Sequence, residues 1–272
     1  MKIAHLADVH FGKIASCGIV EALLADVKSN EADLVIVSGD LTQRARKREY
    51  EQAALLLRSF TAPVLVVPGN HDVYAWWYPF HRLAAPLRRF RRYICDDLSP
   101  TFTNDEVAVL GITSARGWTI QRGWCGAPAR RRIGSFFAGQ PGGRFRILVV
   151  HHPLAAACSI GAEDVAIGGA RTLRAAAAAN VGLVLSGHWH LSHAEMVSES
   201  GEGPLVVAIT GTATSDRWRA PQQRLNQYQV IEILPEHIVV EARHYNPSAR
   251  AYEFDNRSNF ARGPRAGGGI RI

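Results

Sequence analysis

Five short polar motifs, each directly after an apolar run, carry side chains that could do chemistry in this 272-residue chain. They offer carboxylate, amide and imidazole donors and no cysteine thiolate. Such donors suit hard-to-borderline divalent ions such as Mn, Fe, Zn or Ni. The motifs are Asp8-Val9-His10, Gly39-Asp40, Gly69-Asn70-His71-Asp72, His151-His152 and Gly187-His188-Trp189-His190.

The apolar run before each motif predicts a β-strand. Adjacent strands of one sheet end at one edge, so we expect the side chains just beyond these ends to converge. Alternate residues of a strand point the same way, so Asp8 and His10 can face one ion, as can His188 and His190. The pattern therefore predicts a two-metal hydrolytic centre. The runs are Ile3–Ala7, Leu34–Val37, Val64–Val67, Ile147–Val150 and Val181–Leu185.

Other motif residues suggest particular roles. Gly39 permits a sharp turn, so that the carboxylate of Asp40 can bridge two ions. The neutral amide oxygen of Asn70 can bind a metal without adding negative charge. His71 has Asp72 beside it to orient its ring, which suits a general acid near a leaving group.

The elements that must position these residues alternate between strand and helix in the first third of the chain. Apolar residues at three- and four-residue steps predict helices at Gly18–Val27 and Ala45–Phe60. Together with the first three runs they give a β-α-β-α-β order, which implies a largely parallel sheet with right-handed crossovers.

The rest of the chain predicts one domain. We expect a helix covering the site within Val73–Ile94, a strand at Glu106–Ile112, and helices at Arg130–Phe137 and Gly169–Ala179. Short strands between Ala194 and His244 predict a second, partly antiparallel sheet. The catalytic domain is expected to span residues 1–245, and residues 246–272 a loose tail rich in Arg, Pro, Gly and Asn.

Composition narrows the class of protein. The formal charge of +7 favours an anionic partner, although the arginines are spread along the chain. The four cysteines, Cys17, Cys95, Cys125 and Cys158, show no metal-binding or redox spacing and suit free thiols in a reducing compartment. With no signal peptide or membrane-spanning run in the sequence, we expect a cytoplasmic protein, with a location peripheral to the membrane as the alternative.

In their order, the motifs resemble those of the calcineurin-like metallophosphoesterases over about residues 1–215. The resemblance implies an α/β fold, a four-layer α/β/β/α sandwich of two mixed sheets. It implies one ion held by Asp8, His10, Asp40 and His190, and a second held by Asp40, Asn70, His151 and His188. His71 matches the catalytic histidine, and His152 is expected to support the ligands. Trp189 replaces a smaller residue and is expected to narrow the pocket.

The resemblance also implies an activity. The chain is most similar to bacterial single-domain phosphodiesterases, which cleave cyclic or linear nucleotides or glycerophosphodiesters by in-line attack of a metal-bridging hydroxide. Alternatives are a pyrophosphatase of a lipid-linked sugar nucleotide (UDP-diacylglucosamine type), a nuclease, and a non-catalytic scaffold, the last disfavoured because no ligand is missing. The aromatic and arginine residues of Val73–Ile94 could serve a nucleobase, a lipid-linked substrate, a membrane contact or a homodimer contact.

Overall fold

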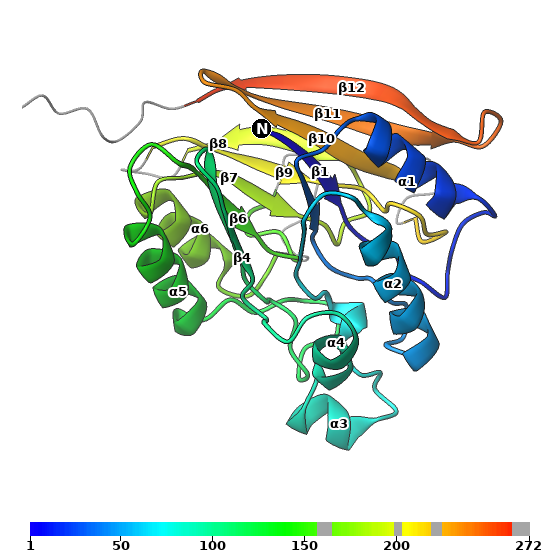
Figure 1. The fold of residues 1–272 in the computed structure, drawn as a ribbon. Coiled ribbons are helices and arrows are strands. Elements are labelled where there is room, and N and C mark those ends of the chain that lie inside the picture. The colour runs from blue at the N-terminus through cyan, green and yellow to red at the C-terminus, as the bar shows by residue number, and fades with distance from the viewer. Residues whose placement is uncertain (157–164, 199–202, 219–224, 263–272) are drawn as a thin grey trace, which may run out of the picture.

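Two six-stranded β-sheets pack face to face in the computed structural model, which describes residues 1–156, 165–198, 203–218 and 225–262. Helices α1 (Ile19–Ser29) and α2 (Lys47–Ser59) cover the outer face of one sheet. Helices α5 (Ala127–Ala138) and α6 (Gly169–Ala178) cover the outer face of the other (Figure 1). This order of layers confirms the predicted α/β/β/α fold class.

The first sheet is built from both ends of the chain, in the order β12-β11-β10-β1-β2-β3. Its parallel strands β1 (Lys2–Leu6), β2 (Leu34–Val37) and β3 (Val64–Val66) confirm the β-α-β-α-β prediction. The antiparallel strands are β10 (Gln227–Ile233), β11 (His237–Asn246) and β12 (Ala251–Ala261).

Strand β12 corrects the prediction of a loose tail from residue 246 onward. It pairs with β11 along its whole length, from Asn246↔Ala251 to His237↔Ala261. The strand was missed because it lies at the edge of the sheet, where Tyr252 is its only buried residue and most of its polar residues face solvent. The remaining tail residues, 263–272, lie outside the described part of the chain.

The second sheet has the order β4-β5-β6-β7-β9-β8. Its strands are β4 (Thr101–Thr103), β5 (Val107–Gly111), β6 (Phe145–Val149), β7 (Val181–Ser186), β8 (His193–Val197) and β9 (Leu205–Ile209). The prediction that the strands between Ala194 and His244 form one sheet was wrong. Strands β8 and β9 belong here, whereas β10 and β11 belong to the first sheet, because local apolar patterns identify strands but not their neighbours.

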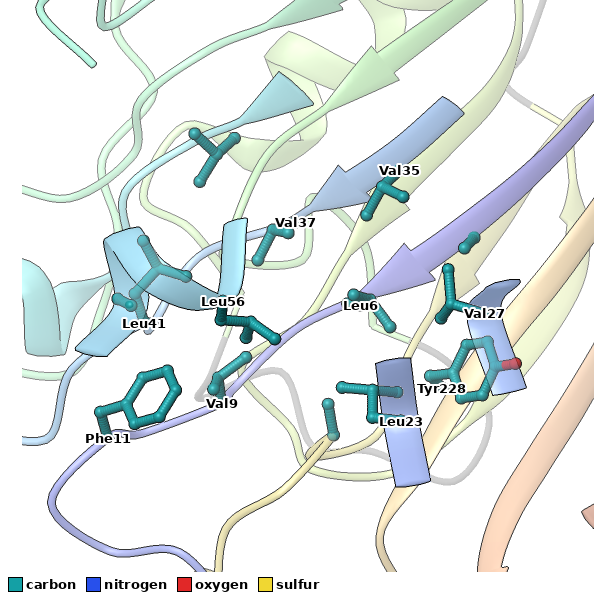
Figure 2. Close-up of a cluster of buried hydrophobic side chains, with 14 of the residues drawn as sticks. Leu6, Val9, Phe11, Leu23, Val27, Val35, Val37, Leu41, Leu56 and Tyr228 are labelled. Carbon is teal, nitrogen blue, oxygen red and sulfur yellow. The ribbon is translucent and has the colours of Figure 1, made fainter. Parts of the chain in front are cut away.

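Three apolar layers hold the sandwich together. One lies between the sheets and joins residues such as Ile36 and Leu185, and the other two lie beneath the helix pairs. Figure 2 shows part of the layer under α1 and α2, in which Leu6 and Val9 pack near Leu23. Burying one such leucine contributes about 1.5–3 kcal/mol, so these layers dominate the stabilisation.

The segment Val73–Ile94 forms two short helices, α3 (Pro79–Ala84) and α4 (Arg88–Tyr93), instead of one. Pro86 separates them, since proline disfavours continuation of a helix through its position. Helix α3 buries none of its residues, whereas α4 buries Phe90. Both project from the end of the sandwich that is lowest in Figure 1.

Every helix among the described residues is too short or too polar to span a lipid bilayer. Cys17, Cys95 and Cys125 are free thiols, and Cys158 lies outside the described part of the chain.

Candidate metal centre

The five motifs meet where the ends of β1, β2 and β3 approach the ends of β6 and β7, so the site lies between two sheets instead of along the edge of one. Hydrogen bonds cross this junction. The Nδ1–H of His151, after β6, donates to the carbonyl of Ser38, after β2, at 2.7 Å. The backbone N–H of His188, after β7, donates to Oδ2 of Asp8, after β1, at 2.7 Å.

The backbone after each strand explains how neighbouring donors converge. Asp8 and His10 have φ angles of 53° and 49°, Asp40 has 53°, and His188 and His190 have 72° and 57°. All five lie in the left-handed region of backbone conformation, which residues other than glycine rarely adopt. The donors therefore converge through left-handed turns beyond the strands. We expected each pair to face one ion because alternate residues of a strand point the same way, and that explanation was wrong. Such strain is concentrated at functional sites.

Two glycines allow the turns to approach one another. A Cβ atom on Gly39, which has a φ of 95°, would lie 2.5 Å from Nδ1 of His151. A Cβ atom on Gly187 would lie 2.4 Å from Cβ of Ala7 and 2.7 Å from Oδ2 of Asp8. A side chain at either position would push the two sheets apart at the site.

Asp8, His10 and His190 form the first group of donors, and all three are buried. Nδ1 of His10 donates to the carbonyl of Thr42 at 3.3 Å, and Nδ1 of His190 donates to the carbonyl of Arg217. The Nε2 atoms of these two histidines are therefore lone-pair acceptors. They nevertheless lie only 3.3 Å from each other, and Oδ1 of Asp8 lies 3.1 Å from Nε2 of His190. Acceptors that face one another at this distance fit a shared cation.

Asp40, Asn70 and His151 form the second group. Nε2 of His151 lies 3.4 Å from Oδ2 of Asp40 and 3.1 Å from Oδ1 of Asn70. Oδ2 of Asp40 is also 3.6 Å from Nε2 of His10, so this carboxylate lies between the two groups. The ring of His188 stands 5.1 Å from the ring of His151, measured between centroids.

Electrostatics favours a bound cation over protons at these carboxylates. Burial acts to raise the pKa of Asp40, but His151 and His71 outweigh it, so the pKa lies well below its usual value. The pKa of Asp8 is likewise held low, where burial is outweighed chiefly by His190 and His10. Two buried, ionised carboxylates surrounded by imidazoles are a suitable site for divalent ions, whose positive charge compensates the buried negative charge.

The structure assigns Asp72 a different part from the one expected. Its carboxylate accepts hydrogen bonds from the backbone N–H groups of Leu41, Thr42 and Gly69, at 3.2, 3.0 and 3.0 Å. It does not orient the ring of His71, whose Nδ1 donates instead to the carbonyl of Gln43 at 2.8 Å. Asp72 therefore holds the turn that carries Asn70 and His71.

The expectations for His152 and Trp189 had different outcomes. Ser114 lies 2.7 Å from Nδ1 of His152 and the carbonyl of Gln121 lies 2.9 Å from its Nε2, so both ring nitrogens have protein partners and the side chain fits a supporting part. Trp189 is buried in the apolar layer under α5 and α6. It does not line the pocket beside His71, so the expectation that it narrows that pocket was wrong.

A cavity of about 240 Å³ opens beside the donors. Asn70 and His71 lie in its wall, together with Trp76 and Arg82 from the segment after the motif. The sequence pattern did not reveal the wall residues from other segments, which are Gln43, Arg44, Ile120, Gln121 and Arg217. They follow no motif, and only the fold brings them to the site. A larger cavity of about 880 Å³ lies beside α5 and α6, away from the donors.

Comparisons with known proteins agree with this geometry. A glycerophosphodiester phosphodiesterase, GpdQ, from Enterobacter lignolyticus is 32% identical over 132 residues, which cover 43% of this chain and 47% of that protein. A 3',5'-cyclic adenosine monophosphate phosphodiesterase, CpdA, from Escherichia coli is 28% identical over 130 residues, covering 48% and 44%. The matches thus span about half the length of these relatives.

The fold is also that of a purple acid phosphatase from yellow lupin (Lupinus luteus) seeds. The TM-score is 0.72 at 11% identity, over 96% of this chain and 54% of that one. The family model described as calcineurin-like phosphoesterase matches residues 1–192, which include all five motifs. The chain therefore belongs to the calcineurin-like phosphoesterase family.

Proposed function

We propose that the protein hydrolyses phosphodiester bonds with the help of two divalent metal ions. The observation that carries the proposal is the set of buried acceptors that face one another, with Asp40 between the two groups. The relatives GpdQ and CpdA are named as phosphodiesterases, which supports a small phosphodiester as substrate. The cavity beside the donors has a volume of about 240 Å³, which suits a small phosphodiester.

One ion would be held by Asp8, His10, Asp40 and His190, and the second by Asp40, Asn70, His151 and His188. When bound, such a pair supplies an activated water and neutralises the phosphoryl oxygens. The donors contain no thiolate, which suits Mn, Fe, Zn or Ni.

The protein's own groups then position the substrate. His71 stands at the junction of the cavity and the donors: its backbone N–H donates to Oδ1 of Asp40 at 2.8 Å, and its ring lies 4.8 Å from that of His10. Its Nε2 is directed away from the Gln43 carbonyl that holds Nδ1. We assign His71 to the leaving oxygen of the ester, which it stabilises or protonates once its Nε2 atom has taken up a proton.

A substrate panel with Mn-loaded protein tests the proposal. Bis(p-nitrophenyl) phosphate, cyclic nucleotides and glycerophosphodiesters should be cleaved, with p-nitrophenyl phosphate as the monoester comparison. Rapid turnover of the monoester without cleavage of any diester would overturn the diesterase assignment.

A lipid-linked substrate, such as a sugar nucleotide of the UDP-diacylglucosamine type, is the second candidate. Two large apolar side chains of the cavity wall are exposed, Trp76 at 73% and Ile120 at 76%, and Phe80 of α3 is 85% exposed. Arg88, Arg91 and Arg92 of the adjacent α4 are exposed and suit anionic head groups. Cleavage of a lipid-linked diphosphate that depends on detergent or vesicles, with cyclic nucleotides left uncleaved, would favour this candidate.

Other assignments are supported less well. A homodimer through the face formed by these apolar side chains and α4 would place arginines of α4 opposite one another if the contact were two-fold symmetric. Gel filtration tests for such a dimer.

Nucleic acid is disfavoured as a substrate because the cavity is small. A non-catalytic scaffold is disfavoured because every donor and His71 are present. Free thiols at Cys17, Cys95 and Cys125 support a cytoplasmic location, peripheral to the membrane if the exposed face binds lipid.

A further inference from the structure

The side chain of Arg217 meets His71 at the edge of the cavity. Its Nη1 atom lies 2.7 Å from Nε2 of His71, 3.2 Å from Nδ1 of the same ring and 3.3 Å from Oε1 of Gln43. A guanidinium has only donors and Nη1 lies nearer to Nε2, so the contact suits a ring whose Nε2 carries no proton. Because Nδ1 of the same ring donates to the carbonyl of Gln43, His71 is held as the tautomer that carries its proton on Nδ1.

The backbone before Arg217 is fixed against the turn after β1 that carries Asp8. Oγ1 of Thr212 donates to the carbonyl of Asp8 at 2.7 Å, and Oγ1 of Thr214 donates to the carbonyl of Val9 at 2.9 Å. The carbonyl of Arg217 itself accepts a hydrogen bond from Nδ1 of His190. The main chain is thus tied to the metal centre, while a long side chain extends from it into the cavity wall.

The other arginines of the cavity wall are used differently. Arg82 donates to the carbonyls of Tyr74 and Thr119 and so fastens two loops. Arg44 is exposed and its guanidinium lies 5.9 Å from the centre of the Trp77 ring. Of the three arginines in the described wall, Arg217 is the one placed against His71.

We propose that Arg217 binds the phosphate group of the substrate, an inference that rests on the proposed function. A guanidinium matches two phosphoryl oxygens in a planar, bidentate hydrogen bond, and its charge strengthens that bond. When the guanidinium turns to the phosphate, it moves away from the ring of His71 and leaves Nε2 open to the substrate. Substrate binding and release of His71 are thereby linked.

The test uses full-length, Mn-loaded protein and three variants: Arg217→Gln, Arg217→Lys and Arg48→Gln. Arg48 is exposed on α2 and does not line the cavity, so it controls for the loss of one charge. Inorganic phosphate affinity is measured by calorimetry, kcat/KM with bis(p-nitrophenyl) phosphate, and metal content by mass spectrometry. Arg217→Gln should weaken phosphate binding and lower kcat/KM by about 10- to 100-fold with unchanged metal content. Arg217→Lys should recover part of the loss, and Arg48→Gln should match the wild type.

Two results would overturn the proposal. If Arg217→Gln binds phosphate and turns over substrate like the wild type, the residue does not bind the phosphate group. If the variant loses metal, its contribution is to support His190. An inactive wild type whose phosphate affinity still depends on Arg217 would refute the proposed function and leave the phosphate site standing.

Discussion

At the scale of single residues, hydrogen bonds to main-chain carbonyls decide which ring nitrogens face the centre. Nδ1 atoms of His10, His151 and His190 all donate to backbone carbonyls, and their Nε2 atoms are thereby directed inward. Such bonds fix the tautomer and the ring orientation of metal-binding histidines. The sequence predicted the donors because their chemical types are distinctive. It could not predict Asp72 correctly, because a carboxylate beside a histidine can equally accept from the backbone.

Replacing His71 separates catalysis from metal binding. We expect His71→Ala to lower kcat by roughly 10²–10⁴-fold, because the leaving oxygen loses its partner, while metal content stays at the wild-type level. Phosphodiesterase assays and mass spectrometry measure the two quantities. His237→Ala, which removes an exposed histidine of β11, serves as the control and should change neither. Loss of metal from His71→Ala would make the histidine structural.

At the scale of elements, the turns after the strands decide the geometry of the site. Apolar runs predicted β1, β2, β3, β6 and β7 to within two residues at each end, because buried strands leave a strong pattern. The left-handed backbone of Asp8 or His190 leaves no such pattern, since it depends on contacts made by the neighbouring turns. The donor residues were therefore predictable from the sequence, whereas the backbone turns that bring their side chains together were not.

Gly39 provides a test of these turns. Gly39→Ala should lower the free energy of unfolding by about 2–4 kcal/mol and reduce metal content, because the new Cβ atom would lie 2.5 Å from Nδ1 of His151. Urea unfolding and metal analysis give the two values.

Gly134, inside α5, is the matched control. A Cβ atom there meets no atom within 4 Å, so Gly134→Ala should stabilise the protein by about 0.5–1 kcal/mol. Equal effects of the two substitutions would refute the close approach at Gly39.

At the scale of the whole molecule, the centre joins the two sheets. Asp8, Asp40 and Asn70 follow strands of the first sheet, and His151 and His188 follow strands of the second. Sequence patterns predicted the layers through the family resemblance, but they assigned β10 and β11 to the wrong sheet. Pairing between β1 and β10 joins residues more than two hundred positions apart, and nothing in either strand alone specifies that partner.

Removal of metal should therefore loosen the contact between the sheets. At an ion concentration 1,000 times the dissociation constant, bound metal stabilises the folded state by about 4 kcal/mol. We expect chelation with EDTA to lower Tm by several degrees in calorimetry, and Mn to restore it. Asp40→Asn, which removes the carboxylate between the donor groups, should abolish most of this shift. An EDTA-insensitive wild-type Tm would count against a metal centre.

Acid should destabilise the metal-free protein partly through His5. Burial lowers the pKa of this histidine from 6.5 to about 4, and its ring lies 2.9 Å from Oγ of Ser38 and 3.1 Å from Oε1 of Gln229. The unfolded chain therefore binds the proton more readily, so the stability contribution is complete above pH 6.5 and is lost as the pH falls toward 4. The loss at pH 4 is about 3 kcal/mol at most.

His5→Gln removes this titration while keeping hydrogen-bonding groups. Its free energy of unfolding, measured by urea in EDTA, should fall less steeply than that of the wild type between pH 6.5 and 4. Parallel slopes would show that other groups cause the acid sensitivity.

The first sheet takes three strands from the beginning of the chain and three from after residue 226, and the second sheet is made entirely from the residues between them. During synthesis on the ribosome, β1 keeps an open edge until β10 emerges. The loop that carries Arg217 and supports Asp8 is also synthesised after all seven proposed donors. We therefore expect a nascent chain that lacks this loop to carry the proposed donors without the carbonyl that accepts from His190, so tight ion binding should follow synthesis of residue 217.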